Sequence, residues 1–235
     1  LKNDMLLVDV VRTNQEAFGR IGMKQPDVRE LLDMTRGDAD TWRMYAEGYT
    51  MGLNQVEQEK TREKVMRYKP KNITELAAFV AAVRPAFKSM LPIFLDRRHF
   101  DYGIPAFDKL IQTREMTSSF LLYQEQTMKT LQFAGFSAPE SYSAIKAIAK
   151  KHPEKVLPLK TRFLEGFAAK ADMPSAEKVW QIIEDATSYG FNSSHAVCVA
   201  LDSLYGAWLK AHHPLEYYTT LLSGYADKGD KDRIS

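Results

Sequence analysis

YGFNSSHAVCVALDSLYGAWLKAHHP, residues 189–214, is the stretch that decides the fold class of this 235-residue chain. After Ser194, four apolar residues recur at helical spacing and predict one long helix with a buried stripe made of Val197, Leu201, Leu204 and Trp208. Pro214 ends that helix, because a proline disfavours helical backbone in the residue before it. LEYYTTLLSGYA, residues 215–226, then predicts a short following helix.

The helical pattern also dominates the chain before this stretch. Four more segments carry it: residues 72–83, 119–135, 137–151 and 175–190. Gly135 and Gly190 stand where helices commonly end. Ser137 and Glu140 have capping-box spacing, and Pro139 falls in the first turn of the same helix. Alternating strand patterns are scarce, so the sequence predicts a mostly α protein with at most a short strand at its N-terminus.

Composition and charge exclude several classes of protein. The apolar fraction of 45% suits a globular core, and the net charge of +2 gives no global sign of a nucleic-acid binder. A single cysteine, Cys198, excludes an internal disulfide framework and favours a cytoplasmic location. No apolar run of about 18 residues predicts a membrane span. Because the chain starts at Leu1, with neither an initiator methionine nor a signal-peptide pattern, we expect it to be a piece of a larger protein.

The turn before the long helix is a candidate anion site. Gly190 ends one predicted helix and Ser194 is a good N-cap for the next, so His195 falls in a first turn. Unpaired backbone N–H groups and the positive end of the helix dipole attract phosphate there, and the Tyr189 hydroxyl can add a hydrogen bond. In the alternative interpretation, Tyr189 packs on the core and His195 is only solvated.

Two lysines of IKAIAKK form a second candidate. Lys146 and Lys150 are four residues apart on a predicted helix and share one face, which makes a basic stripe suited to phosphates. The alternative is that lysines in a last helical turn only complement the negative end of the helix dipole.

The first residues of the chain form a third candidate. Lys2 and Asp4 would point to the same side of a strand, where a lysine can hold phosphate and an aspartate can hold Mg²⁺. The alternative is two solvated surface charges. A zinc site made of His195, Cys198, His212 and His213 is disfavoured, because their spacing lacks the paired pattern of structural zinc sites. A Gly-rich phosphate loop and a Gly-x-Ser-x-Gly nucleophile elbow are absent from the sequence.

A series of short motifs occurs in a fixed order along the chain. They are KNDML (2–6), TMGLNQVE (50–57), KPKNITELAAFVAAVRP (69–85), FLDRRH (94–99), YQEQTM (123–128), AGFS leading into KAIAKKHPE (146–154), and YGFNSSHA (189–196) followed by WLKAHHPLEYY. With these motifs in register, the chain resembles the C family of bacterial replicative DNA polymerases, the alpha subunits of DNA polymerase III, over essentially its whole length.

The resemblance implies a multi-helix fingers domain. Residues 1–10 would be the last strand of an incomplete catalytic palm, residues 11–222 the fingers, and residues 223–235 the start of the following segment. The implied function is to bind the incoming deoxynucleoside triphosphate and template-primer DNA during DNA replication, in the cytoplasm and away from membranes. The chain alone would be inactive, because two of the three palm aspartates of the family belong to an upstream motif that is absent here. Replisome subunits would bind through regions outside this chain.

The resemblance also implies roles for individual residues. Asp4 matches the third palm aspartate, which is catalytic and holds Mg²⁺. The implied nucleotide-binding residues are Lys2, Lys146, Lys150, Lys151, Tyr189 and His195. Arginines proposed to contact the template or primer backbone are Arg62, Arg67, Arg84, Arg97 and Arg98.

Several positions depart from the family pattern. Ile145-Lys146 stands where the family has two arginines, and a lysine cannot offer the bidentate fork of an arginine. Four more departures are Leu7 for glycine, Asn54 for phenylalanine, Ala86 for glycine and Ser193 for lysine. We therefore expect a divergent member, of the kind that a phage or prophage would carry. Two alternatives stay open: a non-catalytic relative that binds nucleic acid, and an unrelated helical interaction module.

Overall fold

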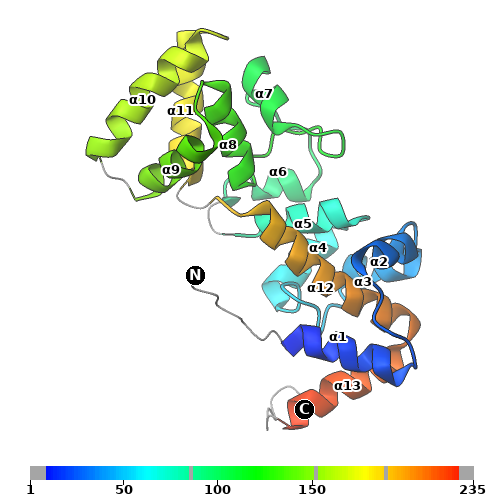
Figure 1. Ribbon diagram of the computed structural model, residues 1–235. Coiled ribbons are helices and arrows are strands. Elements are labelled where there is room, and N and C mark those ends of the chain that lie inside the picture. The colour runs from blue at the N-terminus through cyan, green and yellow to red at the C-terminus, as the bar shows by residue number, and fades with distance from the viewer. Residues whose placement is uncertain (1–8, 85–86, 151–152, 188–189, 228–235) are drawn as a thin grey trace. The chain divides into compact units, whose positions relative to one another are not determined.

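The computed structural model describes residues 9–84, 87–150, 153–187 and 190–227 (Figure 1). These residues form thirteen α-helices, and their only β feature is an isolated parallel bridge between Tyr123 and Phe191. The prediction of a mostly α protein is confirmed. The predicted N-terminal strand falls on residues 1–8, outside the described residues, and Asp9 already begins a helix.

The described residues divide into two compact units. The first unit contains the chain up to Val80 and from Ala196 onward. Its helices are α1 (Asp9–Arg20), α2 (Val28–Thr35), α3 (Ala39–Ala46), α4 (Glu59–Tyr68), most of α5 (Ile73–Ala82), most of α12 (Ser193–His212) and α13 (Pro214–Asp227). Helices α1 and α13 lie side by side (Figure 1). Phe18 of α1 stacks on Trp208 of α12 with ring centroids 5.7 Å apart.

Helix α12 buries a broader face than the predicted stripe, in which Leu201 and Trp208 are half-buried. Leu204 is fully buried, but Val197 is 39% exposed, so the predicted stripe is wrong at its first position. The buried face also contains small residues: Ala196, Ala200, Ser203, Gly206 and Ala207. Small side chains let neighbouring elements approach the helix closely. A pattern that weights only large apolar residues therefore misses this face.

Lys210 lies almost fully buried near the end of α12. Its ammonium group donates to the backbone carbonyls of Tyr49 and Met51, both at 2.7 Å. These two bonds tie the loop after α3 to the helix. Burial lowers the pKa of Lys210 to about 8 from its ordinary 10.5.

The lowered pKa of Lys210 predicts that the first unit becomes more stable as the pH rises from 8 toward 10. Between the folded and unfolded pKa values the unfolded chain holds more protons than the folded chain, so the free energy of unfolding increases with pH. We expect an increase of about 1–2 kcal/mol between pH 8 and 9.5, measured by urea denaturation. The range stops there because burial raises the pKa of Tyr45 and of Tyr217, and this opposes stability above pH 10. Lys210→Met should flatten the slope; an unchanged slope in that variant would contradict the assignment.

The second unit, residues Ala81–His195, contains the remaining helices. They are α6 (Leu91–Leu95), α7 (Pro105–Ile111), α8 (Gln124–Phe133), α9 (Ala138–Ala149), α10 (Pro153–Ala168) and α11 (Met173–Thr187). Helix α9 packs against α8, α10 and α11, and α10 packs along α11 (Figure 1). The centre of this core is aromatic: Phe163, Phe167 and Trp180 are fully buried.

Helix α9 begins as predicted, whereas α8 does not. The Ser137 side chain accepts from the Glu140 backbone N–H, and the Glu140 carboxylate accepts from the Ser137 N–H at 2.7 Å, which completes the capping box. Helix α8 was predicted from residue 119 and starts at Gln124. The Gln126 side chain explains the difference, because its Oε1 accepts from the N–H groups of Leu122 and Tyr123, both at 2.8 Å. These bonds hold the preceding backbone out of the helix.

One face of α10 packs closely against the C-terminal end of α8. Arg162 and Gly166 lie four residues apart on α10, and Lys170 follows two residues after the helix ends. Arg162 donates to the Gly135 carbonyl at 2.9 Å, and Lys170 donates to the Phe133 carbonyl at 2.6 Å. Cations are favoured at a helix C-terminus, so both contacts complement the dipole of α8.

Candidate functional site

Four of the predicted site residues lie outside the described residues: Lys2, Asp4, Lys151 and Tyr189. The roles that the resemblance implies for these four residues therefore stay predictions. The described candidates are Arg62, Arg67, Arg84, Arg97, Arg98, Lys146, Lys150 and His195.

The start of α12 is capped by Asn192, not by Ser194 as predicted. The Asn192 Oδ1 accepts from the His195 backbone N–H at 3.1 Å and from the Ser194 hydroxyl at 2.5 Å. The helix begins at Ser193, so asparagine, which is also a strong N-cap residue, takes the cap position. The His195 side chain is exposed, and its ring lies 5.3 Å from the ring of Phe191.

A carboxylate already occupies the beginning of α12. Both oxygens of Glu125 accept from the Ser193 N–H, at 3.2 and 3.1 Å. The positive end of a helix dipole favours such an anion. The sequence prediction put a phosphate at this point and missed Glu125, which lies 68 residues earlier on α8 and has no local pattern linking it to Ser193.

Phe191 contacts both Arg84 and His195. The turn is attached to α8, because the Gln124 N–H donates to the Phe191 carbonyl at 2.9 Å. The Arg84 guanidinium carbon lies 3.7 Å from the centre of the Phe191 ring, a cation–π contact. Burial lowers the pKa of Arg84, and its buried Nε has no hydrogen-bond partner among the described residues. Arg84 is therefore a cation without a carboxylate to neutralise it in the part of the chain that the structure describes.

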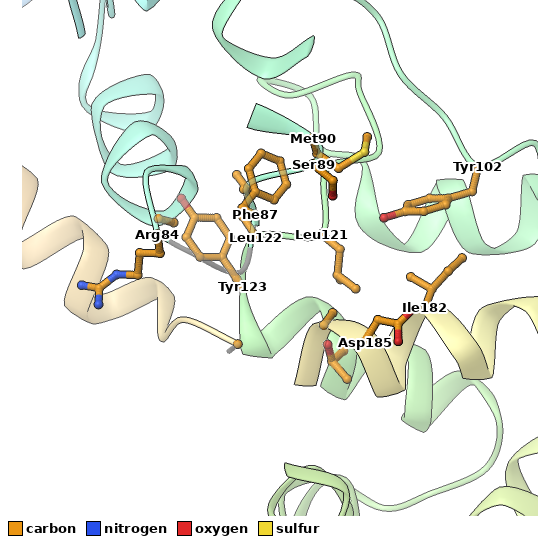
Figure 2. A pocket seen from close by; sticks show the side chains of 14 residues that line it. Arg84, Phe87, Ser89, Met90, Tyr102, Leu121, Leu122, Tyr123, Ile182 and Asp185 are labelled. Carbon is orange, nitrogen blue, oxygen red and sulfur yellow. The ribbon is translucent and has the colours of Figure 1, made fainter. Parts of the chain in front are cut away.

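A cavity of about 240 Å³ lies beside this turn (Figure 2). Its lining includes Tyr102, Tyr123, Leu121 and Asp185. In Figure 2 the hydroxyl end of Tyr102 points toward Leu121, whereas the Arg84 side chain points away from Leu121 and Tyr102. The pKa of each tyrosine is raised to about 12. Burial is the larger cause, and the charge of a neighbouring carboxylate is the smaller one. Both hydroxyls therefore stay protonated and able to donate near neutral pH.

A second hollow of about 530 Å³ is formed by α9 and α10, and it brings Lys146 and Lys150 together. Lys155 and Arg162 of α10 line it as well, over an apolar floor that includes Phe136 and Leu159. Sequence reasoning missed Lys155, because the fold and not the spacing along the chain places it beside the lysines of α9. The hollow is cationic, since its lining contains four basic side chains and one carboxylate, that of Glu140.

Glu140 is already engaged within the protein. Its carboxylate pairs with Arg162 at 2.9 Å and completes the cap of α9. The hydrogen bond from Arg162, followed by those from Ser137, lowers the pKa of Glu140 to about 2. Lys146 contacts the ring of Tyr142, with its Nζ 4.2 Å from the ring centre. The three lysines of the hollow have no ion-pair partner within the described residues.

The remaining candidate arginines lie on other elements of the chain. Arg97 and Arg98 follow α6, where Arg97 adopts left-handed backbone with φ +54° and Arg98 lies 3.8 Å from Asp96. Arg62 and Arg67 are exposed on α4, in the other unit.

Over the described ranges no three His, Cys, Asp or Glu side chains cluster closely enough to hold a metal ion. The same ranges contain no helix with the length and apolar character needed to cross a membrane.

Comparison with known proteins agrees with the order of motifs in the sequence. The family model described as the bacterial DNA polymerase III alpha subunit finger domain matches residues 9–171. DNA polymerase III subunit alpha of Campylobacter jejuni is 34% identical over 86% of this chain and 17% of its own length. The subunits of Thermotoga maritima (34% identical, 92% of this chain, 25% of the relative) and Bacillus subtilis (32%, 88% and 19%) are similar to the same extent. The chain thus spans about a fifth of the length of these relatives. It belongs to the family of bacterial DNA polymerase III alpha subunits, in which it corresponds to the finger domain.

Proposed function

We propose that this chain is the nucleotide-binding fingers portion of a template-directed DNA polymerase, and that the hollow between α9 and α10 receives the triphosphate of the incoming deoxynucleotide. The observation that carries the proposal is the pair Lys146 and Lys150, which line one hollow without a carboxylate to neutralise them in the described part of the chain. Like charges at this spacing on a helix repel each other. A bound polyanion would remove that repulsion, and phosphoryl transfer depends largely on such electrostatic stabilisation.

The turn at Phe191 supports a second part of the proposal. Because Glu125 takes the Ser193 N–H, a phosphate at the start of α12 would meet the exposed His195 imidazole instead of that backbone group. Tyr189, outside the described residues, is proposed to act beside His195. Arg84, which is held on Phe191, is proposed to contact the phosphate backbone of the template or primer, and the more exposed arginines on α4 and after α6 to add to that contact.

Catalysis itself would need parts of a polymerase beyond the described residues. Asp4 is proposed as a magnesium ligand and Lys2 and Lys151 as triphosphate ligands, and all three lie outside those residues. The described residues do not fit a magnesium site by themselves, so no step of nucleotidyl transfer is derived from them. Template-primer DNA, deoxynucleoside triphosphates and other replisome subunits are the proposed partners, in the cytoplasm.

Titrating the 235-residue chain with dTTP tests the proposal directly. We expect weak binding, seen as NMR shift changes at Lys146, Lys150 and His195, and no comparable change with thymidine, which has no phosphates. The double variant Lys146→Ala/Lys150→Ala should weaken dTTP binding by about tenfold, since two partly exposed charge contacts are lost. The matched control is Lys60→Ala/Lys64→Ala, a lysine pair with the same spacing on α4. Equal losses in both double variants, or no loss in the first, would refute the proposed site.

A further inference from the structure

Lys155 occupies a position that helix electrostatics alone would not favour. It is the third residue of α10, which begins at Pro153. A cation in a first helical turn lies near the positive end of the helix dipole and is disfavoured there. The Lys155 side chain also lines the same hollow as the two lysines of α9, so three ammonium groups share one cavity.

Within the described residues none of the three lysines forms an ion pair. Glu140, the carboxylate of the hollow, already pairs with Arg162 and caps its own helix. Placing three like charges around one hollow is unfavourable unless an anion joins them. The rest of the lining is the Ser143 hydroxyl and apolar side chains, so the hollow contains no second carboxylate for the ammonium groups.

Position 145 of α9 adds no charge to the hollow. Ile145 is 5% exposed and belongs to the apolar core. Lys155 reaches the hollow from α10 and adds a third ammonium group from a different helix.

We propose that Lys155 is a third ligand for the triphosphate, one that the motif at residues 145–151 does not contain; this inference rests on the function proposed above. The ligand class is a linear polyphosphate anion. An ammonium group is a compact point charge, so Lys155 would contribute charge to the site without the bidentate geometry of an arginine.

The test is to titrate the chain with inorganic triphosphate in low salt by calorimetry. Lys155→Ala should raise the Kd by about three- to fivefold, as expected for one partly exposed charge contact. Lys155→Arg should bind within twofold of the original chain, because it keeps the charge. Raising the salt concentration should shrink the difference between the original chain and Lys155→Ala.

Lys160→Ala is the matched control. Lys160 lies on the same helix but lines a separate apolar hollow with Leu157 and Glu184. The two variants lower the net charge of the chain equally, so a non-specific charge effect would move both Kd values by the same factor. Equal Kd values for Lys155→Ala and Lys160→Ala overturn the inference. Lys155→Gln, which removes the charge but keeps a polar side chain only one atom shorter, gives the same comparison if the alanine variant does not fold.

The outcome also separates this inference from the proposed function. If Lys146→Ala/Lys150→Ala loses binding while Lys155→Ala does not, the hollow binds triphosphate and only the role of Lys155 fails. If no lysine variant changes the Kd, or the original chain does not bind triphosphate, both proposals fail.

Discussion

Replacing Gly166 with alanine should destabilise the second unit by roughly 2–4 kcal/mol, because the new methyl group has no room. A Cβ atom built on Gly166 would lie only 1.9 Å from the backbone carbonyl oxygen of Ala134. That oxygen belongs to the end of α8 and cannot rotate away as a side chain can. Arg162 and Lys170 bind α8 on either side of this point, so α10 would have to leave both contacts to make space.

Gly224→Ala is the control for Gly166→Ala. Gly224 also lies within a helix, α13, and a Cβ there would meet nothing within 4 Å. Alanine should therefore stabilise α13 by about 0.5–1 kcal/mol. Hydrogen exchange of the backbone amides separates the effects on the two units, since each variant lies in a different one. Unchanged amide protection in α8 and α10 of Gly166→Ala would contradict the close approach.

Trp180→Ala should remove about 3–5 kcal/mol from the stability of the second unit, the usual effect of truncating a fully buried tryptophan. The Trp180 side chain is fully buried in α11, and its ring centroid lies 5.3 Å from that of Phe163. Alanine leaves a cavity that the surrounding aromatic side chains fill only in part.

Trp180→Phe should lower the free energy of unfolding of the second unit much less, by about 1 kcal/mol or less. The indole Nε1 is buried and has no hydrogen-bond partner among the described residues, so the original side chain already carries an unpaired donor. Phenylalanine loses some packing but also removes that donor, and the two effects oppose each other. Urea denaturation followed by circular dichroism measures both variants. If Trp180→Phe were as destabilising as Trp180→Ala, the indole N–H would have to be satisfied, and the balance described here would be wrong.

Six of the thirteen helices of the described residues were predicted, because their signals are local. The capping box of Ser137 and Glu140 lies within four residues, and α9 begins where that pattern places it. The start of α8 was not predictable, because it depends on the Gln126 side chain, which also donates to the distant carbonyl of Ile111 at 3.1 Å. The small residues on the buried face of α12 were missed for a related reason, because small side chains give little hydrophobic signal of their own.

In the candidate site, too, only the residues with a local sequence signal were predictable. Lys146 and Lys150 share a helix, so their spacing alone indicated a common face, and the structure places both in one hollow. Glu125 and Lys155 could be identified only from the structure. Glu125 of α8 accepts a hydrogen bond from Ser193 of α12, and Lys155 of α10 lines a hollow with residues of α9. Asp4 and Tyr189 still rest on the order of motifs in the sequence.

Ile145 limits where this chain can carry additional positive charge. Its side chain is enclosed by the second unit's core, so an arginine introduced there would bring a guanidinium group among apolar side chains. An unpaired buried charge is strongly destabilising, and a single such change would unfold a marginally stable domain. Further cations for the hollow between α9 and α10 can therefore come only from surface positions, and selection for tighter anion binding would act on those positions.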